Sequence, residues 1–163
     1  MSIERAREAL RKAGMEDRIL EFDESSATVE LAAKAVGCEP ARIVKTLSFH
    51  AGDRTVLIAC AGDARIDNRK FKDLFIAKPK MLKAEEAEML IGHAVGGVCP
   101  FGVNPKAEIF LDESILRFDE VYPAAGSSNS AVRLSPEELA RCAAPCIWAD
   151  LCKLPEEHPF PRE

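Results

Sequence analysis

The sequence predicts a single α+β domain, and three observations support this prediction. The chain has 163 residues, which suits one domain, and no repeat, low-complexity tract or linker divides it. Its β-favouring segments are short and clustered. Helical patterns stand before, between and after these clusters, which argues against regular βαβ winding. We expect residues 1–154 to form the domain and residues 155–163, rich in proline and charge, to be a loose C-terminal tail.

The first part of the chain predicts two helices, a short strand and a hairpin. A serine or threonine precedes each helix as an N-terminal cap, and a glycine follows each helix as a stop. The hairpin strands favour β structure, and a loop containing glycine joins them. The expected elements are a helix over 2–12, a strand over 19–22, a helix over 29–36, and hairpin strands over 43–50 and 55–61.

The next segment predicts a third helix, with Asp67 as its cap. We expect this helix to cover residues 69–74, with Phe71 and Leu74 facing inward. The elements expected after it are a short strand over 80–82 and a helix over 84–90.

The segment Ile91–Gly102 holds four glycines and one proline within a dozen residues. Glycine loosens regular structure and proline removes a backbone donor, so we expect a shaped loop. Its small side chains leave backbone N–H groups open to a carbonyl oxygen or a phosphate. A tight connection between core elements would explain one glycine pair equally well, but the full run favours a site.

A second loop of small residues, Pro123–Asn129, could face the first loop. Shortly after it, Ser135, Pro136 and Glu138 mark the start of a helix, because they combine a cap, a first-turn proline and a capping box. The remaining expected elements are strands over 108–111, 120–122, 130–134 and 146–151 and a turn or short helix over 112–116.

Lys45 is the first candidate for a functional side chain, because it stands in an otherwise apolar strand. Its amine could bind a phosphate or hydroxyl group. Strand alternation alone favours a lysine that points to solvent.

Charge and composition narrow the classes of partner. The formal net charge of −5 argues against indiscriminate nucleic-acid binding. Basic residues nevertheless crowd the interval 65–83, which is either a solvated helix face or a phosphate-facing patch. The four residues that we name as RNA-binding candidates are Arg69, Lys70, Lys72 and Lys80.

The six cysteines stand mostly among apolar residues, without signs of secretion, so we expect reduced thiols. None of their spacings is the C-x2-C pair of a zinc site, and we expect neither a metal nor another cofactor. The N-terminus shows no signal peptide, and no stretch has the ~20 apolar residues of a membrane span. We therefore expect a cytoplasmic protein without a membrane partner.

Several separated motifs then occur in a recognisable order, from Thr28 to Leu139. They are Ile43–Leu47, Gly62-Asp63 with Ile66-Asp67, and the loop Ile91–Gly102. In these motifs the chain resembles the YbaK family of aminoacyl-tRNA editing domains, which is related to the insertion domain of bacterial prolyl-tRNA synthetase.

The resemblance implies a mixed, barrel-like β-sheet surrounded by helices. It also implies hydrolysis of amino acids wrongly attached to tRNA, most often tRNA for proline. The implied partners are the acceptor end of tRNA and prolyl-tRNA synthetase, not DNA.

The resemblance also implies roles for individual residues. Lys45 would grip the RNA end, and the G-x-x-x-P element from Gly96 to Pro100 would form the amino-acid pocket. Ser128 and Asn129 stand near the place where alanine-selective domains often have a histidine, which puts alanine specificity in doubt. The implied catalytic residues are Lys45, Gly96 and Gly97, and the implied substrate-binding residues are Gly92, His93, Val98, Cys99, Pro100, Phe101, Gly102, Ser128 and Asn129.

Two of these side chains invite a different interpretation. His93 has no evident partner carboxylate, so we interpret it as a loop residue and not a base. Cys99 lies between Val98 and Pro100 without a paired histidine, so we interpret it as pocket lining and not as a nucleophile.

The chemistry of editing agrees with a site that has no protein nucleophile. A synthetase pocket made for proline rejects the smaller alanine weakly, because a missing methylene is worth only ~1–3 kcal/mol. Cleavage of the activated ester needs a placed water or a substrate nucleophile, together with donors for the developing oxyanion. The alternatives are a non-catalytic module that binds the RNA end or a synthetase, and a small-molecule esterase. The lack of a G-x-S-x-G motif and the scarcity of histidines count against a serine esterase.

Overall fold

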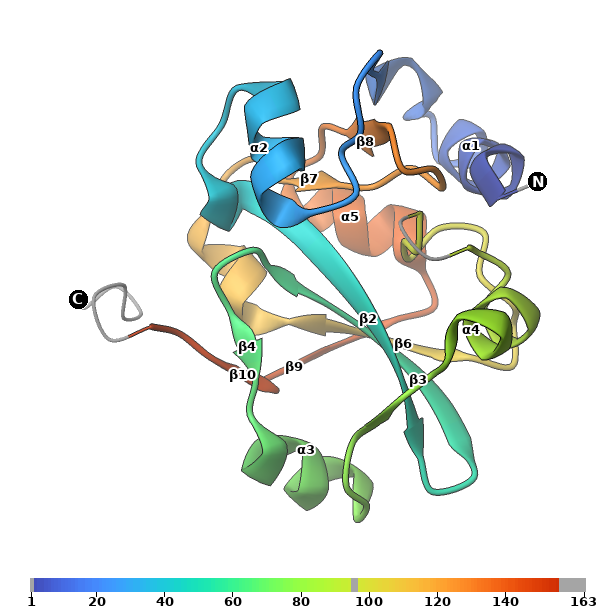
Figure 1. The fold of residues 1–163 in the computed structure, drawn as a ribbon, viewed down its shortest axis with the longest axis vertical. Coiled ribbons are helices and arrows are strands. Elements are labelled where there is room, and N and C mark those ends of the chain that lie inside the picture. Colours follow the sequence, from blue (N-terminus) through green and yellow to red (C-terminus); the bar gives the residue numbers. More distant parts are fainter. Residues whose placement is uncertain (1, 95–96, 156–163) are drawn as a thin grey trace.

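The computed structural model describes residues 2–94 and 97–155, which form one α+β domain as predicted (Figure 1). Gly96 and residues 156–163 of the expected tail lie outside the described residues. Over the described ranges, no helix has the length and apolar character needed to cross a membrane.

Three of the described helices, beginning at residues 29, 68 and 136, directly follow a capping residue that the sequence predicts. Thr28 Oγ1 accepts from the Leu31 N–H at the start of one helix, and Asp67 accepts from Arg69 and Lys70 at the start of another. In the described part of the chain the α-helices are α1 (Ser2–Lys12), α2 (Val29–Val36), α3 (Asn68–Phe75), α4 (Ala84–Leu90) and α5 (Pro136–Ala143). Short 3-10 turns are η1 (Glu16–Arg18), η2 (Pro40–Arg42) and η3 (Glu113–Arg117).

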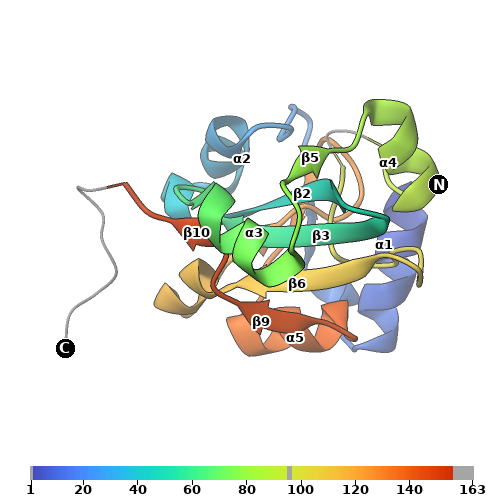
Figure 2. The ribbon, with the colours of Figure 1, turned by 90° about the horizontal axis from the view of Figure 1, so that it is seen from below.

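Within residues 2–94 and 97–155, the strands form one central mixed sheet and two small pairs. The strands are β1 (Ile19–Glu21), β2 (Ile43–Ala51), β3 (Arg54–Ala61), β4 (Arg65–Ile66), β5 (Lys80–Met81), β6 (Glu108–Asp112), β7 (Tyr122–Pro123), β8 (Ser130–Val132), β9 (Ile147–Ala149) and β10 (Cys152–Lys153). The central order is β5-β2-β3-β6-β9, with β7 also beside β2, and Figure 2 shows this row of strands. β1 pairs with β8, and β4 pairs with β10.

The central sheet combines both strand directions. β2 and β3 form the predicted antiparallel hairpin, whereas β6 runs parallel to β3 and β9 runs parallel to β6. The long connections between these parallel strands carry the helices and loops that surround the sheet.

Each face of the sheet has its own apolar core. One core packs the buried side chains of α1 and α5 against Val44, Leu57 and Leu111. The other core holds a chain of aromatic contacts from Phe49 through the residues of α3 to Phe110. Burial of both faces fixes the register of β2 and β3, because a one-residue slip would exchange their faces.

The prediction that Leu74 faces inward is wrong. Leu74 is 47% exposed, and Phe75 is buried in its place. The helix runs one residue past the predicted end, so Phe71 and Phe75, spaced i and i+4, lie on the same face. Their ring centroids are 4.5 Å apart.

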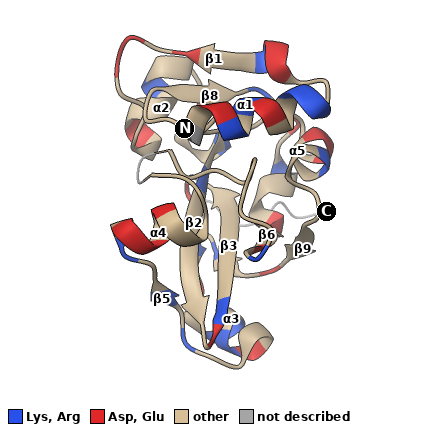
Figure 3. Ribbon diagram, turned by 90° about the vertical axis from the view of Figure 1, so that its right-hand side faces the viewer, with Lys and Arg blue, Asp and Glu red and all other residues tan. Residues whose placement is uncertain are grey.

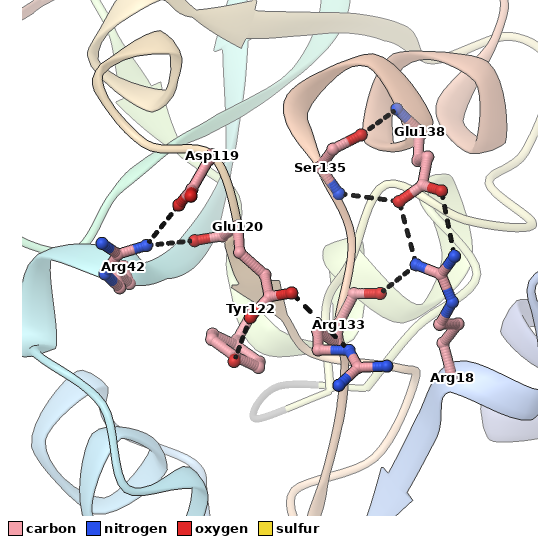
Figure 4. A network of polar contacts seen from close by, with 8 residues as sticks. All are labelled: Arg18, Arg42, Asp119, Glu120, Tyr122, Arg133, Ser135 and Glu138. Atoms are coloured by element: carbon pink, nitrogen blue, oxygen red, sulfur yellow. Dashed lines mark hydrogen bonds and ion pairs between the residues drawn. The ribbon is translucent and has the colours of Figure 1, made fainter.

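A polar network joins the segments around β7, β8 and α5 (Figure 4). Arg18 donates to both carboxylate oxygens of Glu138, at 2.9 and 3.1 Å. Glu138 also accepts from the Ser135 N–H, which completes the predicted capping box. On the other side, Arg42 donates to the Glu120 carbonyl at 3.1 Å, and the Tyr122 hydroxyl donates to the Glu120 carboxylate. The network therefore ties the N-terminal segment to the strands on either side of the second loop.

We predict that Glu138→Gln lowers stability at neutral pH and has little effect in acid. The Ser135 N–H and then the Arg18 guanidinium hold the pKa of the Glu138 carboxyl below its ordinary 4.5. Because the pKa of this carboxyl is lower in the native state than in the unfolded state, its ionised form stabilises the fold at pH values above the unfolded-state pKa. This stabilisation is lost as the pH falls through the native pKa. Urea midpoints at pH 7 and pH 3 check the difference. A deficit of equal size at both pH values would contradict this origin.

Candidate functional site

A cavity of about 270 Å3 lies along the outer edge of β2. This volume is near the lower end for small-molecule sites, about 300–1,000 Å3. α2 and the segment before it form one wall, and residues from β5, β7 and β8 form others. Figure 1 shows α2, β7 and β8 at the same end of β2.

The cavity exists because two short strands cover β2 only in part. β5 pairs with Phe49 and His50, and β7 pairs with Ile43 and Val44. Among the described residues no strand lies beside residues 45–48 on this edge, although the Leu82 N–H donates to the Ser48 carbonyl. Lys45, Thr46, Leu47 and Ser48 all line the cavity.

Lys45 is partly buried at this edge instead of extending freely into solvent. Its Nζ lies 3.4 Å from the Gly62 carbonyl oxygen, in the turn that follows β3. Arg117 holds this turn through a bidentate pair with Asp63, at 2.6 and 3.1 Å. Both side chains of the pair are at least 85% buried, so water screens the interaction weakly. The turn therefore provides a fixed acceptor for the ammonium group.

The glycine-rich loop is anchored by α1. Arg5 Nε donates to the Gly102 carbonyl at 2.9 Å. Gly92 and Gly102 both have positive φ, and a Cβ on either would collide with Arg5. These two glycines thus fit the loop against a helix nearly a hundred residues earlier in the chain, and the sequence patterns do not identify Arg5.

The two small-residue loops meet, as predicted. A Cβ on Gly97 would lie 2.7 Å from the carbonyl carbon and oxygen of Gly126. This distance is too short for any side chain, so the approach requires glycine at position 97. Val98 lines the cavity directly after this contact, whereas Gly96 lies outside the described residues.

The remaining candidates in the first loop pack inward. Pro100 and Phe101 are buried, and Phe101 belongs to the core on the α1 side of the sheet. His93 is fully buried, and its Nε2 donates to the Phe101 carbonyl at 2.6 Å. Burial lowers the pKa of His93 and raises the pKa of the Cys99 thiol to about 12. The expectation that Cys99 has no histidine beside it is wrong, because its Sγ lies 3.6 Å from His93 Nε2. At neutral pH Cys99 is nevertheless a buried neutral thiol, which is a poor nucleophile.

Ser128 and Asn129 are exposed and serve as connectors in this structure. The Ser128 carbonyl accepts from the Ser26 N–H at 2.6 Å, and Asn129 Nδ2 donates to the Phe22 carbonyl at 2.9 Å. Neither residue lines the cavity, but the neighbouring Ser26 and Ser130 do. The loop thus positions two hydroxyl-bearing residues at the cavity wall.

The four basic candidates are not gathered at the cavity. Arg69 and Lys72 are exposed on α3, which Figures 1 and 3 place at the far end of the long axis from α2. Lys70 donates to Asp150 and to the Cys152 carbonyl, both at 2.8 Å. Lys80 is exposed and precedes Met81, which lines the cavity.

Sequence reasoning missed most of the polar groups at the cavity. Its described lining includes hydroxyls but no carboxylate, imidazole or thiol. The described residues also contain no group of three or more His, Cys, Asp and Glu side chains placed to hold a metal ion. One available signal was adjacency to Lys45 on the same strand, and another was the run of hydroxyls before α2. The missed residues with side-chain hydroxyls are Ser26, Thr28, Thr46, Ser48, Tyr122 and Ser130.

We predict that Gly102→Ala destabilises the fold more than Gly14→Ala. Both glycines have positive φ, so alanine at either position costs about 1–2 kcal/mol of backbone strain. A Cβ at position 14 meets open space, whereas one at position 102 meets the Arg5 backbone and adds ~1–3 kcal/mol of overpacking. Urea unfolding of both variants measures the difference. Equal losses would show that contact with α1 does not constrain the loop.

Comparison with known proteins identifies the family. A model of the aminoacyl-tRNA editing domain matches residues 23–142. The uncharacterized protein YwhH of Bacillus subtilis is 45% identical over 154 residues, covering 94% of this chain and 98% of YwhH. A proline–tRNA ligase of Bacillus licheniformis is 29% identical over 138 residues, but this match covers 84% of the chain and only 24% of the ligase.

Solved structures agree with this assignment. The crystal structure of a candidate trans-editing enzyme for prolyl tRNA synthetase has a TM-score of 0.83 and 34% identity, covering 92% of this chain and 96% of the other. The crystal structure of the hypothetical protein APE2540 has a TM-score of 0.80 and 26% identity, covering 91% of this chain and 99% of the other. The chain therefore belongs to the aminoacyl-tRNA editing domain family.

Proposed function

We propose that this protein is a trans-editing hydrolase that deacylates mischarged aminoacyl-tRNA, with tRNA for proline bearing a small non-cognate amino acid as substrate. The observation that carries the proposal is the cavity at the open edge of β2, with Lys45 at its wall. Membership in the editing family supports the reaction class. The candidate trans-editing enzyme and the proline–tRNA ligases among the relatives support the choice of tRNA.

In the proposed reaction, Lys45 binds the ribose or phosphate of the terminal nucleotide and orients the ester. The Gly62 carbonyl, 3.4 Å from Nζ, restrains the ammonium group before the substrate arrives. A restrained cation loses less freedom on binding, and fixed geometry accelerates an ester hydrolysis that uses water as the nucleophile. Backbone donors around Gly96 and Gly97 are proposed to orient the carbonyl or the water.

The cavity suits a small acyl group. Its described walls combine five alanines and three valines with several hydroxyls, and its volume is about 270 Å3. Burial of a short side chain against this apolar surface contributes to binding at ~25 cal/mol per Å2. Alanine, serine and cysteine are therefore the amino acids to test first.

Of the four basic candidates, only Lys80 is adjacent in the chain to a residue that lines the cavity, Met81. We propose that Lys80 contacts the acceptor end of the tRNA.

One observation favours a second candidate, a non-catalytic module that binds the RNA end or a synthetase. The described cavity lining has no side chain that ordinarily acts as a general base at neutral pH. Such a module would retain charged tRNA with its ester intact, so a time course of the bound ester separates the two functions.

We predict that Lys45→Ala reduces kcat/KM for deacylation by about 100-fold or more, the usual effect of removing a group that stabilises the transition state. The assay uses purified protein and tRNA for proline charged with alanine, serine, cysteine or proline. Lys12→Ala is the matched control, because Lys12 is exposed and does not line the cavity. Wild-type protein that binds all four substrates but cleaves none would favour the binding module, and full activity of Lys45→Ala would exclude the proposed role of Lys45.

A further inference from the structure

The hydrogen-bonding pattern of the hairpin decides where the main chain of Thr46 points. A two-residue turn, Gly52-Asp53, joins β2 to β3, so Ala51 and Arg54 form a hydrogen-bonded pair. Along an antiparallel pair, hydrogen-bonded and non-hydrogen-bonded pairs alternate. Main-chain hydrogen bonds therefore join Lys45 to Cys60. Thr46 and Ala59 lie opposite each other without main-chain hydrogen bonds between them. The N–H and C=O of Thr46 point away from β3.

Two hydrogen bonds confirm this register. The Ser48 carbonyl, two residues from Thr46 and with the same orientation, accepts from the Leu82 N–H at 3.1 Å. The Ala61 N–H, opposite Val44, donates to Ser114 Oγ at 3.1 Å and not to β2. Residues 44, 46, 48 and 50 thus present their main-chain groups to the outer edge.

Thr46 is the one member of this set without a neighbour on that edge among the described residues. His50 pairs with β5, the Ser48 carbonyl is bonded to Leu82, and Val44 pairs with β7. The Thr46 side chain also lacks a hydrogen bond, because its Oγ1 is buried and has no hydrogen-bond partner. Native proteins satisfy nearly all buried polar groups, so an orphan in a cavity wall indicates a place for a ligand or water.

An aminoacyl ester carries the hydrogen-bonding groups that match the unpaired N–H and C=O of Thr46. Its atoms N–Cα–C=O repeat the main chain of one strand residue. In a hydrogen-bonded antiparallel pair, two residues exchange two bonds, each N–H donating to the opposite C=O. A bound aminoacyl group can form the same pair, its α-amino group donating to the Thr46 C=O and its ester carbonyl accepting from the Thr46 N–H. This is strand addition reduced to one residue.

We propose that the main chain of Thr46 is the subsite for the part of the substrate common to all amino acids, holding both the α-amino group and the scissile carbonyl. The inference rests on the proposed deacylase function. The Thr46 N–H then also faces the oxyanion that develops on the ester carbonyl during attack by water. The acyl side chain plays no part in this pair, so selection among amino acids falls to the rest of the cavity wall.

The main chain is tested by replacing the amide N–H of Thr46 with an ester oxygen, which nonsense suppression with the α-hydroxy analogue of threonine achieves. Loss of one oxyanion donor costs about 100-fold in kcat, and we expect a fall of at least about 10-fold in kcat/KM on alanyl-tRNA. The matched control is the same replacement at Thr55, which takes the same threonine analogue. Thr55 lies opposite His50 on β3, so its N–H points away from β2, and it does not line the cavity. Each replacement weakens one carbonyl in the β2–β3 ladder equally, so the control corrects for stability, and we expect it to stay within about 3-fold of wild type.

A substrate lacking the amino group tests the second bond. Wild-type protein is expected to cleave propionyl-tRNA at least about 10-fold more slowly than alanyl-tRNA, after division by the uncatalysed hydrolysis rate of each ester. Thr46→Val, which replaces the hydroxyl with a methyl group and keeps the main chain, is expected to keep more activity than the main-chain replacement.

The outcomes separate this inference from the function on which it rests. If wild-type protein cleaves no aminoacyl ester, both are overturned. If it cleaves alanyl-tRNA but the Thr46 replacement keeps full activity, or if the Thr55 replacement loses as much activity as the Thr46 replacement, only the subsite is overturned. Equal normalised rates on propionyl-tRNA and alanyl-tRNA would likewise overturn the bond to the α-amino group.

Discussion

The incomplete pairing of the β2 edge is the constraint on which the site depends. Unpaired backbone groups at a strand edge must find a partner, and proteins normally cover or block such edges. Here β5 and β7 each pair with two residues of β2 and stop. The interval between them is a lined cavity instead of a flat edge, and Lys45 lies within it.

The rest of the molecule holds this interval in place from several directions. The Arg117–Asp63 pair fixes the turn beside Lys45, and Arg5 fixes the glycine-rich loop from α1. The backbone contact between Gly97 and Gly126 joins that loop to the second one. Rigid neighbours matter for a site that works by geometry, because a positioned water needs fixed donors more than it needs a strong base.

Local patterns in the sequence predict the local structure well, and long-range contacts explain the differences. Helix caps such as Thr28 and Ser135 and the β2–β3 hairpin follow from neighbouring residues, and each is confirmed. The parallel pairing of β6 with β3 and the contact of Arg5 with Gly102 join segments far apart in the chain, which no local pattern encodes.

The candidate site divides in the same way. Residue type and resemblance point to Lys45, but strand alternation does not reveal a gap between two short neighbouring strands. Thr46 was overlooked because its contribution lies in its backbone orientation, which every residue type shares. Conversely, Ser128 and Asn129 have suitable chemistry for a ligand, yet hydrogen bonds to the segment before α2 occupy the Ser128 carbonyl and the Asn129 amide.

The most direct test of the central claim is an NMR titration with a non-hydrolysable substrate analogue, alanine joined by an amide to the 3′ position of adenosine. The account predicts that the largest backbone shift changes occur at residues 45–48, with smaller ones at Met81, Leu82, Tyr122 and Ala124. Changes centred on α3, or none at saturating analogue, would contradict a substrate site at the open edge of β2.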